Sequence, residues 1–230
     1  MLDPDLIFQI PKKGLYFLSL GGIGEIGANC YLYGSDNKWI MIDLGLTFAD
    51  DKYPGIDLLL PQVDFLDQIK NNLEAIIISH GHEDHAGALA FFIDKIDCPI
   101  YATGFACSLI KSRLKEFGKL NSTNLNIIDP KKSLKFNNFK LQFISTTHSI
   151  PEPYSIVITT KYGKLLHTAD WKIDPNPLLG ENFDTQSFKE LGNEGLLALI
   201  GDSTNADTPG YSKSEHDVRE ELISVFSRYN

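Results

Sequence analysis

The sequence predicts an α+β fold in which two β-sheets pack face to face and helices cover their outer faces, an αββα sandwich. Short apolar runs rich in β-branched and aromatic residues recur along the chain, as is typical of strands. The runs are 15–20, 29–33, 39–43, 75–79, 99–102, 139–146, 155–160, 164–170 and 196–201. Strands come first in succession and then mixed with helical patterns, an order typical of sheets covered by helices. Because 43% of the 230 residues are hydrophobic, the chain can bury a sizeable core.

Turn residues and helical periodicity place the remaining elements. Segments 21–22, 34–37 and 137–138 are rich in glycine and asparagine and mark hairpins. The spacing predicts helices over 84–96 and 105–117, each with an apolar stripe. It also predicts a helix within 212–229. There Ser214 serves as the N-cap, and one apolar face holds Val218, Leu222, Ile223 and Phe226.

Composition limits the function classes. A net charge of -9 argues against a broad basic surface for nucleic acid, although it does not exclude a nuclease. Two local basic clusters stand out, and solvated helix and hairpin surface is the favoured interpretation of both. The clusters are Lys111, Arg113, Lys115 and Lys119, and Lys131, Lys132, Lys135 and Lys140.

Three further observations favour a cytoplasmic protein. No apolar run is long enough to cross a membrane. Residues 1–5 do not resemble the start of a signal peptide. The three cysteines, Cys30, Cys98 and Cys107, are widely spaced in apolar surroundings, which indicates buried thiols in a reducing compartment rather than disulfides.

The segment directly after the apolar run 75–79 carries most of the chemistry. It offers metal-binding side chains at His80, His82, Asp84 and His85. Imidazole nitrogens and carboxylate oxygens suit zinc, manganese or iron. His80 and His82 are two positions apart, so an extended backbone points both rings to one side. Asp84 and His85 open the helical pattern and can face a second position. One short loop can therefore supply two neighbouring cations, an arrangement used in hydrolysis.

Further ligands are expected where other strand-like runs end. His148 follows one run and is held by prolines at 151 and 153. Asp170 ends another, and its two oxygens could bridge two cations. Asp43 ends a third run close before a glycine. Taken singly, each of these residues is more often structural than catalytic. His167 is interpreted as structural, with support of the metal ligands as the alternative, and His216 is expected to be exposed.

The sequence resembles metallo-β-lactamase-fold hydrolases, and within them the ribonuclease J family of β-CASP nucleases. The His/Asp loop is specific to the superfamily only, whereas the glycine-rich N-terminal segment and residues 201–206 narrow the resemblance to ribonuclease J. The matching segments cover almost the whole chain and are 21–30, 42–46, 79–87, 147–151, 167–172 and 201–207.

This resemblance implies a role for each candidate residue. His80, His82 and His148 would hold a first metal ion, Asp84 and His85 a second, and Asp170 would bridge the two. Asp84, His85 and Asp170 would thereby be the catalytic groups, and Asp43 would orient the metal-ligand loop. The family cuts RNA internally and as a 5′-to-3′ exonuclease, using two divalent cations. Zinc is the first choice, with manganese or magnesium as alternatives.

The domain organisation departs from that of the family. In ribonuclease J the β-CASP domain is inserted into the lactamase fold, which the chain then completes. Here residues 1–205 would form the N-terminal part of the metallo-β-lactamase domain and 206–230 the start of the β-CASP segment. The chain would be a fragment of a longer enzyme or a truncated relative that lacks a last histidine ligand and the dimerising domain. RNA is the expected partner, together with a homo-oligomer or a full-length family member, and no membrane is expected.

Two other functions remain open on the sequence. A small-molecule hydrolase of the same superfamily, acting on thioesters, lactams or lactones, would have the same metal loop. A truncated and inactive remnant could still bind metal or associate with a full-length partner. An exposed apolar patch would favour the remnant.

Overall fold

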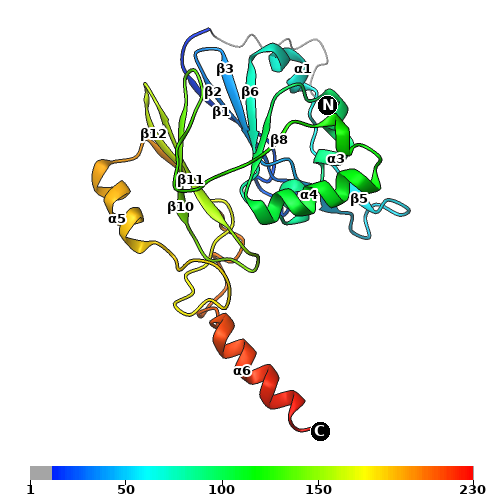
Figure 1. Ribbon diagram of the computed structural model, residues 1–230, viewed down its shortest axis with the longest axis vertical. Coiled ribbons are helices and arrows are strands. Elements are labelled where there is room, and N and C mark those ends of the chain that lie inside the picture. The colour runs from blue at the N-terminus through cyan, green and yellow to red at the C-terminus, as the bar shows by residue number, and fades with distance from the viewer. Residues whose placement is uncertain (1–11, 230) are drawn as a thin grey trace.

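Two β-sheets carry the fold in the computed structural model, which describes residues 12–229 (Figure 1). Residues 1–5, expected to lack a signal peptide, lie outside the described residues. The first sheet has the order β1-β2-β3-β6-β7-β8. Its strands are β1 (Leu15–Gly21), β2 (Cys30–Ser35), β3 (Lys38–Ile42), β6 (Leu73–Ile77), β7 (Ile100–Ala102) and β8 (Leu125–Ile127). In the second sheet the order is β13-β12-β11-β10-β9. Its strands are β9 (Leu134–Lys135), β10 (Lys140–Ser145), β11 (Tyr154–Thr160), β12 (Gly163–His167) and β13 (Ala198–Ile200). A small ribbon pairs β4 (Thr47–Phe48) with β5 (Leu58–Leu59).

The strand directions place the ends of several strands at one edge of both sheets. In the first sheet β1, β2 and β3 pair antiparallel, and β3, β6, β7 and β8 then run parallel. The second sheet is an antiparallel meander of β9 to β12, with β13 parallel to β12. Asp36 and Asn37 join β2 to β3 with φ values of 48° and 64°, the left-handed backbone of a tight hairpin turn.

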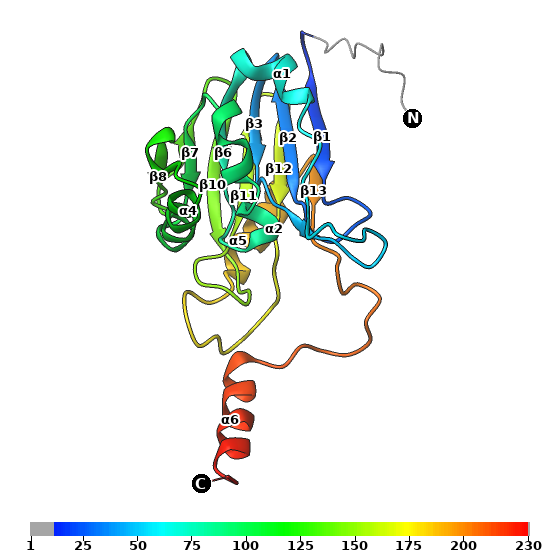
Figure 2. The same cartoon turned by 90° about the vertical axis from the view of Figure 1, so that its right-hand side faces the viewer.

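Most of the helices lie over the outer faces of the two sheets, whereas the last one projects away from both (Figure 2). The helices are α1 (Phe65–Ile69), α2 (Glu83–Ala86), α3 (Leu89–Phe92), α4 (Gly104–Glu116), α5 (Thr185–Glu194) and α6 (Glu215–Phe226), with short 3₁₀ turns at Lys70–Asn72, Ile93–Lys95 and Leu120–Ser122. Within the described residues, none of these helices has the length and apolar character needed to span a bilayer.

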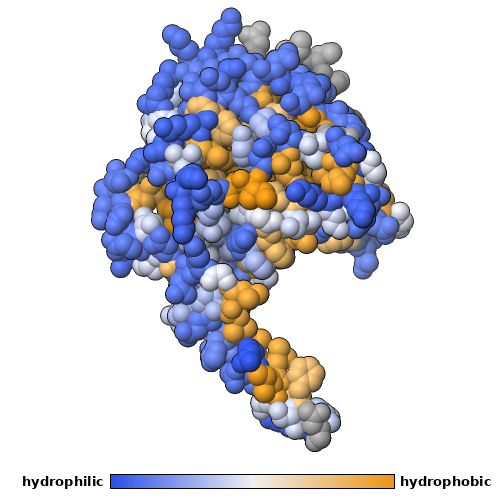
Figure 3. Space-filling model, in the orientation of Figure 1, coloured by the Kyte–Doolittle hydropathy of each residue, from blue (hydrophilic) through white to orange (hydrophobic). Residues whose placement is uncertain are grey.

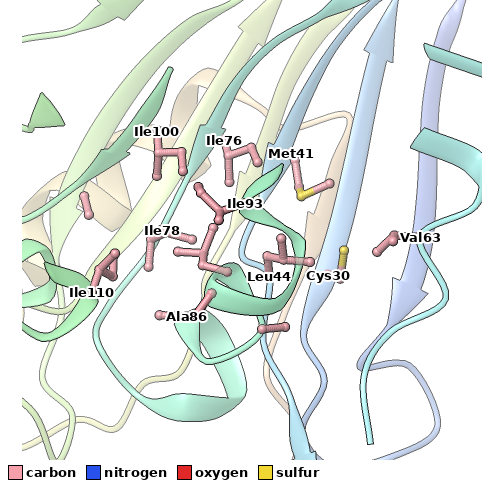
Figure 4. Packing of buried hydrophobic residues seen from close by; sticks show 14 of the residues in the cluster. Cys30, Met41, Leu44, Val63, Ile76, Ile78, Ala86, Ile93, Ile100 and Ile110 are labelled. Atoms are coloured by element: carbon pink, nitrogen blue, oxygen red, sulfur yellow. The ribbon is translucent and has the colours of Figure 1, made fainter. Parts of the chain in front are cut away.

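Three apolar clusters fill the spaces between the layers. Between the sheets, Ile40, Ile42 and Ile77 of the first sheet meet Leu141 and Ile156 of the second. A larger cluster lies between the first sheet and the helices over it, where Ile76 and Ile78 face Ile93 and Ile110 (Figure 4). A smaller one packs α5 on the outer face of the second sheet through Leu191. The order helix, sheet, sheet, helix confirms the predicted αββα sandwich.

All nine predicted strand runs are confirmed as strands, whereas the single helix predicted over 84–96 is wrong. The structure has two short helices, α2 and α3, followed by a 3₁₀ turn. The helix is interrupted because neighbouring backbone takes its hydrogen bonds: the carbonyl of Asp84 accepts the N–H of Asn29, and that of His85 accepts the N–H of Leu44. The N–H of Ala88 donates to the carbonyl of Leu44 instead of to its own helix. Helices α1 and α5 and strands β4, β5, β8 and β9 were not predicted.

The helices predicted over 105–117 and within 212–229 are confirmed as α4 and α6. The prediction of buried cysteines is confirmed for Cys30 and Cys107 and wrong for Cys98, which is half-buried. Ser214 caps α6 by accepting the N–H of His216, whose side chain is exposed as predicted. The apolar face predicted for α6 is exposed within the described part of the chain, and orange residues mark this projecting helix (Figure 3). All three cysteines are free thiols.

Candidate metal centre

The metal-binding side chains predicted from separate strand ends meet at one edge of the sandwich. The loop that follows β6 carries His80, His82, Asp84 and His85. His148 follows β10, and Asp170 follows β12, so both come from the second sheet. Two groups of possible ligand atoms result, each with its atoms within 4.8 Å of one another. They are His80, His82, His148 and Asp170, and Asp84, His85 and Asp170.

The first group has the spacing of a metal site. His82 Nδ1 lies 3.1 Å from His80 Nε2 and 3.1 Å from His148 Nε2. Ligand nitrogens around a tetrahedral zinc ion lie about 3.3 Å apart, given Zn–N bonds of ~2.0–2.1 Å. Asp170 Oδ2 lies 3.5 Å from His148 Nε2 and completes the set. Three imidazoles and one carboxylate therefore fit one divalent cation.

The second group shares Asp170 with the first. Asp170 Oδ1 lies 3.2 Å from His85 Nε2, and Asp84 Oδ2 lies 3.6 Å from the same nitrogen. The two oxygens of Asp170 thus face different groups, as a bridging carboxylate would require. Within the described residues this second group offers three protein ligands.

Asp43 is fully buried and sets the orientation of two of the histidines. It accepts hydrogen bonds from the Ser79 N–H at 2.8 Å and from the Ser79 hydroxyl at 2.9 Å. It also lies 2.7 Å from His85 Nδ1, and Ser79 Oγ lies 3.0 Å from His80 Nδ1. These contacts are satisfied when Nδ1 of both rings carries a proton, so Nε2 is the nitrogen of each ring that a cation would bind in place of a proton.

Backbone geometry holds Asp43 and Asp170 in place. Asp43 has a φ of 62°, and Ala169, directly before Asp170, has a φ of 51°. Non-glycine residues adopt this left-handed backbone rarely, and such residues cluster at functional sites. Gly45 lies so close to the carbonyl of Asp84 that a Cβ there would stand 1.6 Å from its oxygen. Glycine is required because the loop after β3 and the start of α2 touch through their backbones.

The electrostatics match a cation site. Burial lowers the pKa values of His80, His82 and His148, so these imidazoles are neutral at pH 7 and could act as metal ligands. Burial would raise the pKa of Asp170, but its hydrogen bond to His85 and the neighbouring histidines lower it, so the carboxylate is ionised. For His85 burial also acts against charge, yet Asp43 and Asp170 raise its pKa to about 10. Carboxylates that favour a proton on this ring equally favour a metal cation beside it.

A cavity of about 420 Å³ opens beside Asp84, His85 and Asp170. Its lining includes residues of the glycine-rich loop between β1 and β2 and residues 201–204. His167 lines the cavity and is buried, with Nδ1 2.9 Å from the Tyr33 hydroxyl, which accords with its structural interpretation. Burial lowers its pKa to about 4, so the ring is neutral.

Two groups in the site were not predicted as functional. Asn29 Nδ2 lies 3.0 Å from His85 Nε2 and 3.3 Å from Asp84 Oδ2. The Tyr31 hydroxyl donates to Asn29 Oδ1 at 2.7 Å and fixes the amide. Asp202 lines the same cavity as the glycine-rich loop. The available signals were an asparagine after a glycine-rich loop and an aspartate at a strand end. Neither residue type by itself distinguishes a residue that contacts the candidate metal ligands from one that forms a turn.

A buried carboxylate, Asp174, ties the metal-ligand segments to α6. It accepts the N–H groups of Asn176 and Glu215 at 2.9 Å each. Its own N–H donates to the Thr147 hydroxyl, and Thr147 pairs with Lys172 as an isolated bridge. These contacts join a residue beside His148, a residue near Asp170 and the start of α6.

Replacing Asp174 with alanine should lower the free energy of unfolding by about 2–3 kcal/mol, because two backbone N–H groups lose a charged acceptor. Burial would raise the pKa of Asp174, but these hydrogen bonds lower it to about 2. The stabilisation is therefore present above pH ~4 and is lost as pH falls through about 2. Urea unfolding of both proteins between pH 7 and pH 2 checks this expectation. A difference in stability that stays constant down to pH 2 would contradict it.

Comparison with known proteins agrees with this geometry. Residues 23–198 match the model of the metallo-beta-lactamase superfamily. The chain is 42% identical over 218 residues to ribonuclease J of Sinorhizobium meliloti. The aligned region covers 93% of this chain and 38% of that protein. It is 38% identical to ribonuclease J of Synechocystis (94% and 34% covered) and 34% identical to ribonuclease J2 of Bacillus subtilis (91% and 38% covered). The chain thus spans a little over a third of the length of these relatives.

A solved structure shares the fold at low sequence identity. A protein of unknown function from Enterococcus faecalis superposes with a TM-score of 0.64 at 15% identity, over 92% of this chain and 57% of that one. Together with the sequence matches, this likeness confirms the predicted fold and the resemblance to ribonuclease J.

Proposed function

The chain belongs to the metallo-beta-lactamase superfamily, and from that premise we propose that it hydrolyses RNA phosphodiester bonds as the catalytic N-terminal part of a ribonuclease J-type enzyme. The observation that carries the proposal is the pair of ligand groups sharing Asp170, joined to sequence similarity with ribonucleases J that extends over more than nine-tenths of the chain. Residues 1–205 would form the catalytic domain, and 206–230 the first segment of a β-CASP domain. Cleavage from the 5′ end and internal cleavage are both proposed.

The residues would hold two divalent cations, zinc in the first instance. His80, His82 and His148 would bind one cation, Asp84 and His85 the other, and Asp170 both. When bound, the ions would supply Lewis-acid chemistry, activating water and neutralising charge on the phosphoryl oxygens.

The protein's own groups organise that chemistry. Asp43 accepts a hydrogen bond from the Nδ1–H of His85. The Ser79 hydroxyl donates to Asp43 and accepts from the Nδ1–H of His80. Both rings would therefore present Nε2 to the cations. Asn29 positions Asp84 and His85 from the opposite side. The cavity lined by the glycine-rich loop and residues 201–204 would admit the phosphodiester group next to Asp170.

The proposal is tested by incubating the zinc- or manganese-loaded protein with 5′-monophosphorylated RNA and, in parallel, with thioester and lactone panels. We expect RNA products only, and we expect them to disappear when a chelator removes the metal. His80→Ala combined with His82→Ala should remove the first metal ion and lower RNA cleavage by roughly a hundredfold or more. Turnover of a thioester without RNA cleavage would indicate the small-molecule hydrolase. Metal binding without any turnover would indicate the inactive remnant.

A further inference from the structure

A row of lysines crosses the outer face of the second sheet, at the end opposite to the metal centre. Lys135 of β9 lies directly across from Lys140 of β10. Lys140 lies across from Thr159 of β11, and Thr159 lies across from Lys164 of β12. Residues directly opposite one another project to the same side of a sheet. We call Lys135, Lys140 and Lys164 the lysine row.

The alternation of side chains shows which face the row occupies. Leu141 and Leu165, one position further along β10 and β12, belong to the core between the sheets. The side chains of Lys140 and Lys164 therefore point to the outer face. Both lysines are near the starts of their strands, whereas His148 and Asp170 follow the strand ends. The row spans three strand spacings, or about 14 Å.

The charge arrangement is unfavourable for the folded chain alone. Two like charges directly opposite on neighbouring strands repel each other. Within residues 12–229, neither Lys135 nor Lys140 forms an ion pair, whereas Lys164 pairs with Glu194. In a protein of net charge -9, carboxylates are plentiful, yet none compensates this pair.

A hollow of about 310 Å³ adjoins the row. Lys135 and Lys140 line it together with Lys161, which pairs with Asp36 on its other side. Thr159 also lines the hollow, and its hydroxyl has no hydrogen-bond partner in the described part of the chain. Of these groups, the ammonium groups of Lys135 and Lys140 lack a carboxylate partner among the described residues, and an anion in the hollow would supply one.

Protection of an exposed strand edge explains only part of this pattern. Lysine on an edge strand discourages pairing with another chain, and β9 is the edge of the second sheet. That role accounts for Lys135. It does not account for Lys140, which lies on the inner neighbour β10 and faces the first lysine.

The other basic cluster, on α4, differs in this respect. Arg113 pairs with Glu116, and Lys119 pairs with Asp94. Lys111 and Lys115 are exposed on the same helix. The α4 cluster therefore provides a comparison with similar lysine content and no like-charge pair across strands.

We propose that the lysine row binds the backbone phosphates of single-stranded RNA, at a surface separate from the metal centre. The choice of RNA rests on the proposed function. A strand with repeated phosphates can reach the unpaired Lys135 and Lys140 and also Lys164, about 14 Å away across the row, whereas a single small anion cannot. The row would thereby hold a part of the RNA that is distant from the bond being cleaved.

The test measures binding without hydrolysis. A fluorescently labelled single-stranded RNA of twenty nucleotides is titrated with the full chain in the presence of chelator, over a range of salt concentrations. Lys135→Gln combined with Lys140→Gln should weaken binding about fivefold or more at low salt. It should also reduce the slope of log affinity against log salt by about 1.4, since each phosphate contact on a single strand contributes about 0.7. Lys111→Gln combined with Lys115→Gln removes the same charge and should leave both quantities unchanged.

Folding of the variant is checked separately. Lys135→Gln alone removes the repulsion and should raise the melting temperature by about 1–2 °C. Equal weakening by both double variants would overturn the proposal, because net charge alone would then explain it. Displacement of the RNA by millimolar inorganic phosphate would indicate a single-anion site. If the Lys135→Gln and Lys140→Gln variant lost binding of polyglutamate but kept binding of RNA, the ligand would be an acidic polypeptide. Either result overturns the proposal. Since metal is absent from every titration, a failure of hydrolysis does not affect this outcome.

Discussion

Replacing Asp170 with alanine is expected to weaken both metal positions at once and to lower RNA hydrolysis on the order of a hundredfold to a thousandfold. Its two carboxylate oxygens lie 3.2 Å from His85 Nε2 and 3.5 Å from His148 Nε2. A single substitution therefore removes a ligand from each group and leaves the neighbouring cations without their shared negative charge. Metal content by mass spectrometry of the native protein, together with the rate of RNA cleavage, checks the expectation.

The same loop offers a control for this variant. Glu83 is exposed and belongs to neither group of ligand atoms, so Glu83→Gln changes a nearby charge without removing a ligand. Its metal content should match that of the unaltered protein. Loss of one metal ion with full retention of the other in Asp170→Ala would show that Asp170 does not bridge the two positions.

Replacing Asp43 with asparagine is expected to lower metal affinity by about 10–100-fold while the fold is retained. Asparagine has the same shape and tolerates the left-handed backbone found at this position, where φ is 62°. Its amide nitrogen, however, is a donor and can face His85 Nδ1 only when that nitrogen is unprotonated. The proton then moves to Nε2, and the lone pair needed for the cation is lost. The Ser79 N–H can still donate to the amide oxygen.

Nitrogen NMR of the metal-free proteins, recorded at a pH where His85 is neutral, distinguishes the two tautomers of this ring, and chelator competition measures the metal affinity. Asp43→Ala serves as the comparison, because it leaves the buried Ser79 and His85 donors without an acceptor and should cost about 3–5 kcal/mol of folding free energy. Unchanged zinc affinity in Asp43→Asn, with the tautomer reversed, would show that Asp43 does not act through His85.

Much of the fold could be predicted from local patterns. Strand runs such as 75–79 and 155–160 have apolar, β-branched residues whose preference for extended backbone does not depend on distant contacts. Short elements were missed because β8 and β9 contain only three and two residues, too few for a periodic signal. The 84–96 segment has the periodicity of one helix, but backbone groups near residues 29 and 44 take its hydrogen bonds.

The candidate site likewise contains residues that the sequence could predict and residues that it could not. Local sequence sufficed to identify His80, His82, Asp84 and His85, because their spacing alone places donors on one loop. Asn29 carried no such signal, since its contacts to Asp84 and His85 connect residues more than fifty positions apart.

Sequence alone predicted nine of the strands, the capping of α6 by Ser214 and the candidate ligand loop, since each depends on neighbours along the chain. The tertiary structure was needed to show that His148 and Asp170 reach that loop, that Asp43 contacts His85 directly and His80 through Ser79, and that Lys135 faces Lys140. Those arrangements arise from strand pairing and sheet packing, which join residues distant in sequence through contacts that no local periodicity encodes.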